Sequence, residues 1–408
     1  MLGWLGGIVA TSGSGSGSRS RVSVAMSMLI VLAALLVVPA LPGEASQRSA
    51  FVPPPPPPLS AAAVFVYDAT AGVPLFAKDA DARLAPASLT KIVTALVVLE
   101  HAALDETVTI GPEDIVDETQ SRANLIAGDT LTVRNLLVGL LVPSGNDAAL
   151  ALARHVGTGL PGGGEVSAVD RFVAEMNRLV TDRGLQNSSF ANPSGLDGDD
   201  HYTSARDLAV LTAEAIENPT LAEIMGTSAA TLPSALGSAG YPVNTTHDMV
   251  LEGTAVAGKT GTTEEAGGCL VTVSLEGGNQ VVTVILGAEL TTDVQGNRTS
   301  DARYPETREL IALLPERYDW IDPSMPNAVP GLPQELSVWD ASLSAGGRIP
   351  VPRNRVAELG YRLVLGAPAE PGLPVGTVLF TVGSEVLAEQ PLVQAALLSA
   401  APLALSEV

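Results

Sequence analysis

The chain of 408 residues contains only three lysines, and two of them stand in short motifs suited to nucleophilic chemistry. Ser88 and Lys91 form the motif Ser-Leu-Thr-Lys. A serine hydroxyl is a weak nucleophile unless a base removes its proton, and residues three apart on a helix lie on the same face. We therefore expect Lys91 to reach the Ser88 hydroxyl, with Ser88 as the nucleophile and Lys91 as its general base.

The surroundings of Lys91 favour an uncharged amine, which is the form that can accept a proton. Its neighbours Leu89, Ile92 and Val93 are apolar, and a second cation at Lys259 would disfavour the ammonium form as well. Pro86-Ala87-Ser88 is a plausible helix entry. This entry would direct the backbone N–H of Ser88 toward an oxyanion, and the N–H of Thr262 is the simplest second donor.

A second motif, Ser144-Gly145-Asn146, follows Pro143, which must end the apolar helix expected over Leu136 to Leu141. The motif therefore lies on an exposed turn between helices. Ser144 could relay a proton between Lys91 and the leaving group, and Asn146 could bind a substrate amide. The alternative is that both residues only cap the helix that starts near Asp147.

The third motif is Lys259-Thr260-Gly261, within a segment rich in glycine. Lys259 and Thr260 could hold a substrate carboxylate through charge-assisted hydrogen bonds. Gly261 would leave room for a peptide backbone beside the strand. A solvated surface lysine is the alternative, but glycines on both sides of the motif favour close approach by another chain.

These motifs occur in the order Ser-x-x-Lys, Ser-x-Asn, Lys-Thr-Gly, which is the order in penicillin-binding proteins and class A β-lactamases. With Pro143 to Ala148 and Ala191-Asn192-Pro193-Ser194-Gly195-Leu196, the chain resembles the D-alanyl-D-alanine carboxypeptidases, or low-molecular-mass penicillin-binding proteins, over residues 60–316. The resemblance implies a serine peptidase that trims peptidoglycan stem peptides ending in D-Ala-D-Ala and that β-lactams acylate. It also suggests that Arg298 lies near the substrate carboxylate, although a surface arginine is an equal alternative.

Two other functions use the same features. A β-lactamase of this fold would need a second base, for which Glu165 and Glu175 are the glutamates in the expected region, although neither begins the expected glutamate-to-asparagine pattern. A non-catalytic peptidoglycan-binding protein would rely on the C-terminal region instead. The intact Ser88, Lys91 and Lys259 favour an enzyme. Trimming, transpeptidation and endopeptidase cleavage share one acyl-serine, so the sequence does not separate them.

Composition excludes several other classes of protein. The net charge of -22 and the pI near 4.4 give an acidic field that would repel phosphate backbones, so we expect no nucleic-acid partner. A single cysteine, Cys269, and four scattered histidines provide no disulfide and no metal-ligand spacing. We expect no metal and no cofactor, and Cys269 is predicted to be a buried structural thiol.

The order of elements predicts an α+β fold. A hairpin over residues 63–67 and 73–76, several helices, short strands after residue 250 and a helix near 301–314 indicate helices packed on an antiparallel sheet. The resemblance implies that this domain, residues 60–316, has the β-lactamase/transpeptidase-like fold. Residues 317–333 are expected to form a linker and residues 334–408 a small C-terminal all-β domain, with a strand at Leu336–Trp339.

The N-terminal region has the pattern of an exported protein. Residues 22–41 carry no charge and follow two arginines, which is typical of an export signal in residues 1–45, or of an uncleaved membrane anchor. The proline run at 53–58 predicts an extended linker over residues 46–59. We therefore expect an extracytoplasmic enzyme at the cell wall or at the outer face of the cytoplasmic membrane.

Overall fold

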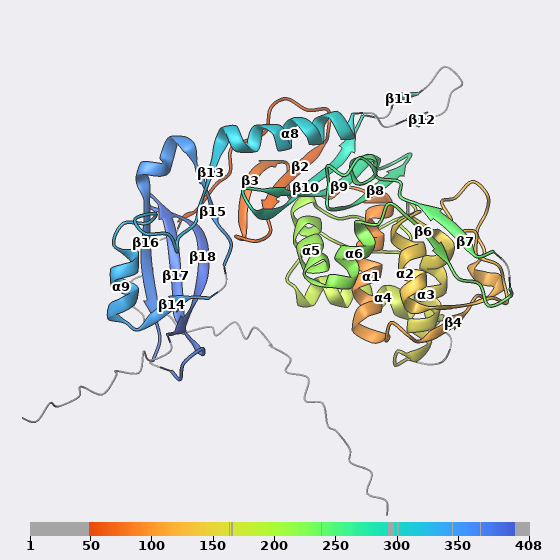
Figure 1. Cartoon of the computed structure of the whole chain (residues 1–408). Coiled ribbons are helices and arrows are strands. Elements are labelled where there is room, and N and C mark those ends of the chain that lie inside the picture. Colours follow the sequence, from red (N-terminus) through yellow and green to blue (C-terminus); the bar gives the residue numbers. More distant parts are fainter. Residues whose placement is uncertain are drawn as a thin grey trace, which may run out of the picture. The chain divides into compact units, whose positions relative to one another are not determined.

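The computed structural model describes residues 49–395 except 163, 165, 238, 290, 293–297, 300–301, 345 and 368, and only the backbone of 291–292 and 298–299. A five-stranded sheet lies at the centre of its larger region, in the order β3-β2-β10-β9-β8 (Figure 1). All its neighbouring strands are antiparallel. The strands are β2 (Ala63–Asp68), β3 (Val73–Lys78), β8 (Ala257–Thr263), β9 (Gly267–Glu276) and β10 (Asn279–Ala288).

Both faces of this sheet are covered, because alternate side chains of one strand enter two different cores. Phe65 of β2 packs in the core that contains the helices, whereas Val64 and Val66 pack in a second core on the other face. The helix α8 (Arg303–Arg317) contributes Leu310 and Leu314 to this second core. Strand β8 is the last strand of the sheet, so one of its edges is free of strand partners among the described residues.

Helices between β3 and β8 form the other layer, which confirms the predicted α+β fold (Figure 1). They are η1 (Ala87–Leu89), α1 (Thr90–His101), η2 (Pro112–Asp114), α2 (Val133–Leu141), α3 (Asn146–Gly159), α4 (Ala168–Asp182), α5 (Ala205–Glu217), α6 (Pro219–Met225) and α7 (Asp248–Leu251). Two small two-stranded antiparallel sheets accompany them, β4 (Thr107–Thr109) with β5 (Thr130–Thr132), and β6 (Ala229–Leu232) with β7 (Tyr241–Asn244). Apolar residues at helical spacing made these helices predictable.

The C-terminal region forms a second sheet in the order β1-β18-β17-β16, with β14 also paired to β18. Its strands are β1 (Ser49–Ala50), β14 (Ala341–Leu343), β16 (Leu359–Leu365), β17 (Pro374–Val382) and β18 (Glu385–Gln394). A smaller pair joins β13 (Tyr318–Ile321) to β15 (Ile349–Pro352), followed by η3 (Arg353–Glu358). A short ladder, β11 (Thr291–Thr292) with β12 (Arg298–Thr299), precedes α8.

The strand predicted at Leu336–Trp339 is wrong, because α9 (Leu332–Val338) occupies this segment. Leu332 and Leu336 are both buried, and their spacing of four residues is that of a helix face. Pro333 stands in the first turn, where a missing N–H costs nothing. The C-terminal region is therefore not all-β, and the expected linker 317–333 contains β13 and the start of α9.

The proline run lies along the edge of the main sheet. The N–H of Ala77 in β3 donates to the carbonyl of Pro54, and Lys78 Nζ donates to the carbonyls of Leu59 and Ala61. Ser49 and Ala50 pair with β18, so the segment expected as a plain linker contributes to a sheet. The export segment predicted over residues 1–45 lies outside the described residues. None of the described helices is both long and apolar enough to cross a membrane.

Candidate active site

Ser88 lies in η1, the turn that leads into α1, at a backbone held in an unusual conformation. Ala87 has φ of +48°, a left-handed value that costs a residue with a side chain roughly 1–2 kcal/mol. Two glycines allow neighbouring segments to approach this turn. A methyl group at Gly195 would lie 1.9 Å from Ala87 O, and one at Gly261 would lie 3.0 Å from Pro86 O. The loop 191–196 and strand β8 therefore both pack against the Ser88 turn.

We predict that Gly195→Ala destabilises the protein and slows acylation of Ser88. Gly195 has φ of +91°, and its added methyl group would collide with the carbonyl of Ala87. Gly184→Ala is the matched control, because Gly184 also has positive φ but nothing lies within 4 Å of the added methyl group. We expect the control to lose about 1–2 kcal/mol of unfolding free energy with unchanged acylation. Equal acylation rates in both variants, measured with a labelled β-lactam, would contradict the close packing.

Lys91 is completely buried, and its amine lies at the centre of the site. Its Nζ lies 2.9 Å from Ser88 Oγ, 2.7 Å from Asn146 Oδ1 and 2.6 Å from the carbonyl oxygen of Ser194. Burial lowers the pKa of Lys91 to about 7, although the charge of Asp147 acts in the opposite direction. These values support the expectation that Lys91 is partly uncharged at neutral pH and close enough to deprotonate Ser88.

The second motif lies where α2 ends and α3 begins, as its proline predicted, but the predicted exposure is wrong: Ser144 and Asn146 are both buried. Asn146 is the first residue of α3, and its amide nitrogen donates to Gln120 Oε1, which leaves its oxygen toward Lys91. The carboxylate of Asp147 accepts the backbone N–H groups of Ala123 and Leu125. Asp147 thus attaches the 120–125 segment to α3 and keeps Gln120 beside Asn146, so Asn146 does more than cap a helix.

Ser144 and Lys259 form a pair across the site. Lys259 Nζ donates to Ser144 Oγ at 2.8 Å, and both side chains are buried. Burial lowers the pKa of Lys259 well below its ordinary value, and the nearby cations Lys91 and Arg303 lower it further. The partner of Ser144 is therefore Lys259, whereas we expected a relay that begins at Lys91. The alternative of a solvated surface lysine does not apply, since Lys259 is 1% exposed.

Strand β8 carries the third motif along its free edge. Thr260 Oγ1 lies 2.5 Å from Thr246 Oγ1, and Lys259 Nζ also donates to the carbonyl of Thr260. The place where a methyl group on Gly261 would stand is 3.2 Å from the backbone nitrogen of Ser88. The structure therefore brings together Ser88, Lys91, Ser144, Asn146, Lys259, Thr260, Gly261 and Thr262.

Arg303, the first residue of α8, is a site residue that the motifs did not identify. Its Nη1 donates to Thr262 Oγ1 at 2.8 Å and to the carbonyl of Gly261 at 3.0 Å. Its Nε is buried and has no hydrogen-bond partner among the described residues. The side chain of Arg298, our sequence-based candidate for this role, lies outside what the structure describes. In the sequence, Arg303 stands five residues after Arg298, at the start of the helix predicted near 301–314. This position was the only indication that Arg303 could take the role assigned to Arg298.

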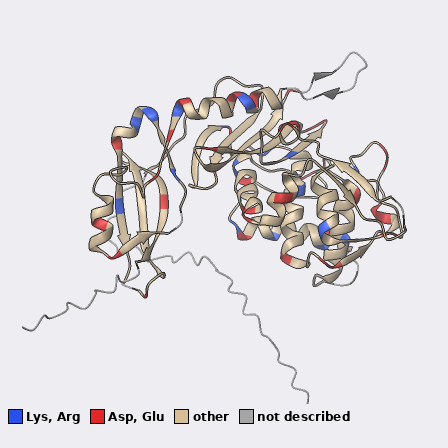
Figure 2. Cartoon of the chain, viewed as in Figure 1, with Lys and Arg blue, Asp and Glu red and all other residues tan. Residues whose placement is uncertain are grey.

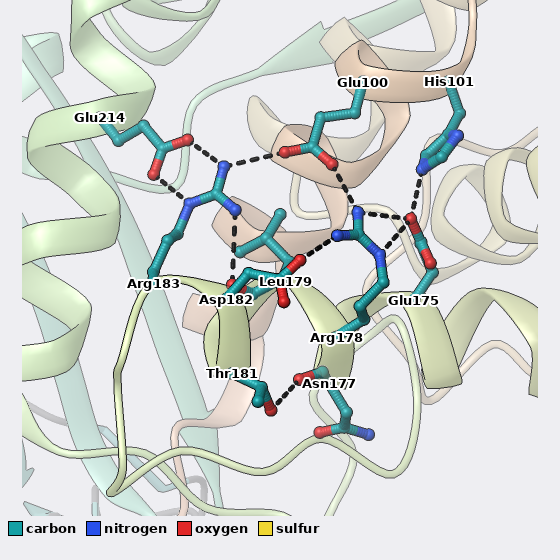
Figure 3. A network of polar contacts seen from close by, with 10 residues as sticks. All are labelled: Glu100, His101, Glu175, Asn177, Arg178, Leu179, Thr181, Asp182, Arg183 and Glu214. Carbon is teal, nitrogen blue, oxygen red and sulfur yellow. Dashed lines mark hydrogen bonds and ion pairs between the residues drawn. The ribbon is translucent and has the colours of Figure 1, made fainter. Parts of the chain in front are cut away.

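Glu175 serves in an ion-pair network rather than as a second base. It binds His101 and Arg178, while Glu100 binds Arg178 and Arg183 (Figure 3). The hydrogen bond from Arg178 is the main reason that the pKa of Glu175 lies below its usual range. Glu100, His101 and Glu175 lie close enough together to suggest a metal site, but two guanidinium groups already neutralise the carboxylates. Glu165, the other β-lactamase candidate, lies outside the described residues.

Cys269 is a buried thiol, as predicted. The side chain is inaccessible, and burial raises the pKa of its thiol to about 11. A thiol reacts as the thiolate, so Cys269 is a poor nucleophile at neutral pH. Its Sγ lies 3.8 Å from the carbonyl oxygen of Ala85 and 3.6 Å from that of Ala266, which makes it part of the packing behind β8.

Comparison with known proteins gives consistent matches. The sequence model of the family described as D-alanyl-D-alanine carboxypeptidase matches residues 50–290. The D-alanyl-D-alanine carboxypeptidase of Streptomyces sp. (strain K15) is 35% identical over 227 residues, which are 53% of this chain and 77% of that protein. The D-alanyl-D-alanine carboxypeptidase DacC of Escherichia coli is 28% identical over 354 residues, covering 82% of this chain and 83% of its own.

Solved structures match the same region and, in one case, most of the chain. The crystal structure of the Streptomyces K15 DD-transpeptidase has a TM-score of 0.55 at 30% identity and covers 64% of this chain and 98% of its own. Penicillin binding protein 5 from Haemophilus influenzae has a TM-score of 0.63 and covers 84% of this chain and 98% of its own. At 24% identity, the second likeness shows the fold alone.

Proposed function

The chain belongs to the D-alanyl-D-alanine carboxypeptidase family, and we propose that this serine peptidase removes the terminal D-alanine of peptidoglycan stem peptides through an ester on Ser88. The observation that carries the assignment of Ser88 is the position of the buried Lys91 amine, 2.9 Å from Ser88 Oγ. Release of D-alanine from a peptide ending in D-Ala-D-Ala, lost in Ser88→Ala, tests the proposal. A folded wild-type protein that releases none would contradict it.

The three contacts of Lys91 suit a general base. An uncharged amine has two N–H donors and one lone pair. The carbonyl of Ser194 and the amide oxygen of Asn146 accept the two N–H groups, which turns the lone pair toward the Ser88 hydroxyl. Lys91 takes the proton from Ser88 Oγ as this oxygen bonds to the carbonyl carbon of the scissile amide. The backbone N–H groups of Ser88 and Thr262 stabilise the oxyanion that forms.

The Ser144–Lys259 pair stands where the leaving D-alanine needs a proton. Ser144 Oγ accepts a hydrogen bond from Lys259 Nζ, so the single hydroxyl proton of Ser144 is available to the amide nitrogen as its bond to carbon breaks. The hydrogen bond from Lys259 Nζ stabilises negative charge on Ser144 Oγ, which makes Ser144 a better acid. Once D-alanine has left, the proton that Lys91 took passes to the Ser144 oxygen, which restores both groups. Water then attacks the ester, Lys91 takes a proton from this water, and the same proton goes to Ser88 Oγ as the ester bond breaks.

The substrate carboxylate is held by Lys259, Thr260 and Arg303. Lys259 and Arg303 place two basic side chains at one point of a chain whose net charge is -22, and Thr260 adds a hydroxyl. Burial and the nearby cations disfavour the charged form of Lys259, and a bound carboxylate would favour it. Figure 2 shows that elsewhere in the described chain basic residues are scattered among acidic ones. The free edge of β8 would pair with the extended stem peptide, which directs its terminal carboxylate along the strand toward this group.

We predict that Arg303→Gln raises the KM for a peptide with a free C-terminal carboxylate by about 10–100-fold, the effect of losing a charge-assisted hydrogen bond. The same peptide with a C-terminal amide should show a much smaller difference between wild type and variant. Arg308→Gln is the matched control, since Arg308 lies on the same helix but binds the exposed Glu252. Equal effects of Arg303→Gln on the KM of both peptides would show that Arg303 does not bind the substrate carboxylate.

We also propose where the enzyme acts and what inhibits it. Its substrate lies outside the cytoplasm, which fits export through residues 1–45 and possible attachment through residues 22–41. A β-lactam presents a carboxylate and a strained amide in the arrangement of the substrate, so it should acylate Ser88 and inhibit the enzyme. Among the described residues, Glu175 does not favour a β-lactamase, because Arg178 and His101 bind its carboxylate. The contact between Lys91 Nζ and Ser88 Oγ favours an enzyme over a non-catalytic binder.

A further inference from the structure

One buried imidazole joins the loop 191–196 to the Ser88 turn, and the proposed reaction does not use it. His201 is 5% exposed and lies just before α5. Its ring packs edge-on against Phe190, with 5.7 Å between ring centroids. Its two nitrogens contact Ala191 of the loop and Thr90 at the start of α1.

The hydrogen bonds around His201 assign each proton. The backbone N–H of Ala191 donates to Nδ1 at 3.0 Å, so Nδ1 carries no hydrogen. Nε2 therefore carries the ring proton and donates to Thr90 Oγ1 at 2.8 Å. Thr90 Oγ1 donates in turn to the carbonyl of Ala87 at 2.9 Å. Burial lowers the pKa of His201 to about 4, against the opposing charge of Asp197, which keeps the ring in this neutral form.

The end of this relay is the carbonyl of a strained peptide group. Ala87 O and the N–H of Ser88 belong to the same planar peptide unit, in which a trans bond directs them oppositely. A hydrogen bond that fixes Ala87 O therefore also fixes the direction of the Ser88 N–H. Ala87 O also accepts the backbone N–H of Thr90. Because Ala87 has φ of +48°, this unit needs such contacts to stay in place.

We infer that His201 and Thr90 are positioning residues for the oxyanion hole: the relay from His201 Nε2 through Thr90 Oγ1 to Ala87 O aims the N–H of Ser88 at the oxyanion. This inference rests on the proposed function, which supplies the oxyanion. This role differs from simple packing. The Thr90 hydroxyl already donates to the Ala87 carbonyl, so it does not need His201 as a hydrogen-bond partner. The imidazole makes the hydroxyl a better donor by donating to its oxygen.

Thr90→Val tests the relay, because it keeps the shape of the side chain and removes the hydroxyl. With a peptide ending in D-Ala-D-Ala, we expect kcat to fall about 10–100-fold while KM changes less than about 3-fold. The fall in kcat is smaller than for complete loss of an oxyanion-hole donor, because the Ser88 N–H is misaligned but still present. A peptide boronic acid, whose boron-bound oxygen enters the oxyanion hole, should bind more weakly by a similar factor. Thr90→Ser should restore kcat to within about 3-fold of wild type.

Two further variants complete the comparison. His201→Met should resemble Thr90→Val, and His201→Gln, which retains an N–H donor, should lie between it and wild type. Thr212→Val is the matched control, because Thr212 is equally buried and its hydroxyl donates to the carbonyl of Leu208 within α5. We expect this control to lose stability without a change in kcat.

The outcomes separate the relay from the reaction itself. Wild-type kcat in Thr90→Val, or a lower kcat with unchanged affinity for the boronic acid, would overturn the inference while Ser88 acylation stands. If His201→Met fails to fold, Thr90→Val and Thr90→Ser still decide. A wild-type protein that is never acylated would overturn the proposed function, and the inference with it.

Discussion

Ser88→Ala is expected to abolish the covalent adduct with benzylpenicillin and to reduce release of D-alanine by at least about 10⁴-fold, the usual cost of removing the nucleophile of a serine hydrolase. No other described hydroxyl lies as close to the Lys91 amine as Ser88 Oγ, at 2.9 Å. Intact-protein mass spectrometry over hours would show one adduct per wild-type chain and none on the variant. Peptide mapping should place the adduct on Ser88.

Two controls make this result specific. Cys269→Ala should be acylated like wild type, because the Cys269 thiol is buried and contributes no contact to Ser88 among those described. Ser88→Ala should retain the wild-type Tm, since Ser88 is only half-buried. An adduct that persists in Ser88→Ala would assign the nucleophile elsewhere. Rapid turnover of the drug without a lasting adduct would favour a β-lactamase.

The motifs predicted most of this site because helix geometry sets their local distances. Residues 88 and 91 share a helix face whatever the rest of the fold, so the contact between Ser88 and Lys91 followed from spacing alone. The low pKa of Lys91 followed from its apolar neighbours. Pro143 correctly placed the second motif where one helix ends and the next begins, but not its burial, which depends on the segments that pack over it.

Pairings between distant segments were less predictable. The sequence suggested a proton relay between Lys91 and the leaving group through Ser144, whereas packing gives Ser144 the partner Lys259. Thr90 and Ser194 lie within quoted motifs, but their spacing indicates neither the contact of the Ser194 carbonyl with Lys91 nor that of the Thr90 hydroxyl with His201. Arg303 and His201 required the tertiary structure, because their contacts span 41 and 111 residues of chain. In the C-terminal region, α9 was mistaken for a strand because seven residues are too few to establish a period.

Lys91 should give the acylation rate its pH dependence. Acylation requires the uncharged amine, and burial lowers the pKa of Lys91 to about 7. The rate constant for acylation should therefore rise about tenfold per pH unit below pH 7 and level off above it, as the uncharged fraction approaches one. Lys259 donates to Ser144 and would bind the substrate carboxylate. Its protonation should therefore affect KM more than it affects the rise in acylation rate below pH 7.

Lys91→Met removes the base and keeps the length of an apolar chain, and Lys91→Arg keeps a cation that does not deprotonate. We expect both to lower the acylation rate constant by about 10³-fold or more and to abolish the limb near pH 7, since a base typically contributes about 10²–10⁴-fold. If Lys91 acted only as a cation, Lys91→Arg would retain much of the rate and Lys91→Met would not. Stopped-flow acylation by a fluorescent β-lactam from pH 5 to pH 9 measures both the rate constant and its pH dependence.

A wild-type rate that does not change with pH, or a rise below pH 7 that persists in Lys91→Met, would assign the base to another residue. Ser194 and Asn146 would then hold an ammonium group as acceptors, and their orientation of a lone pair toward Ser88 would have no role.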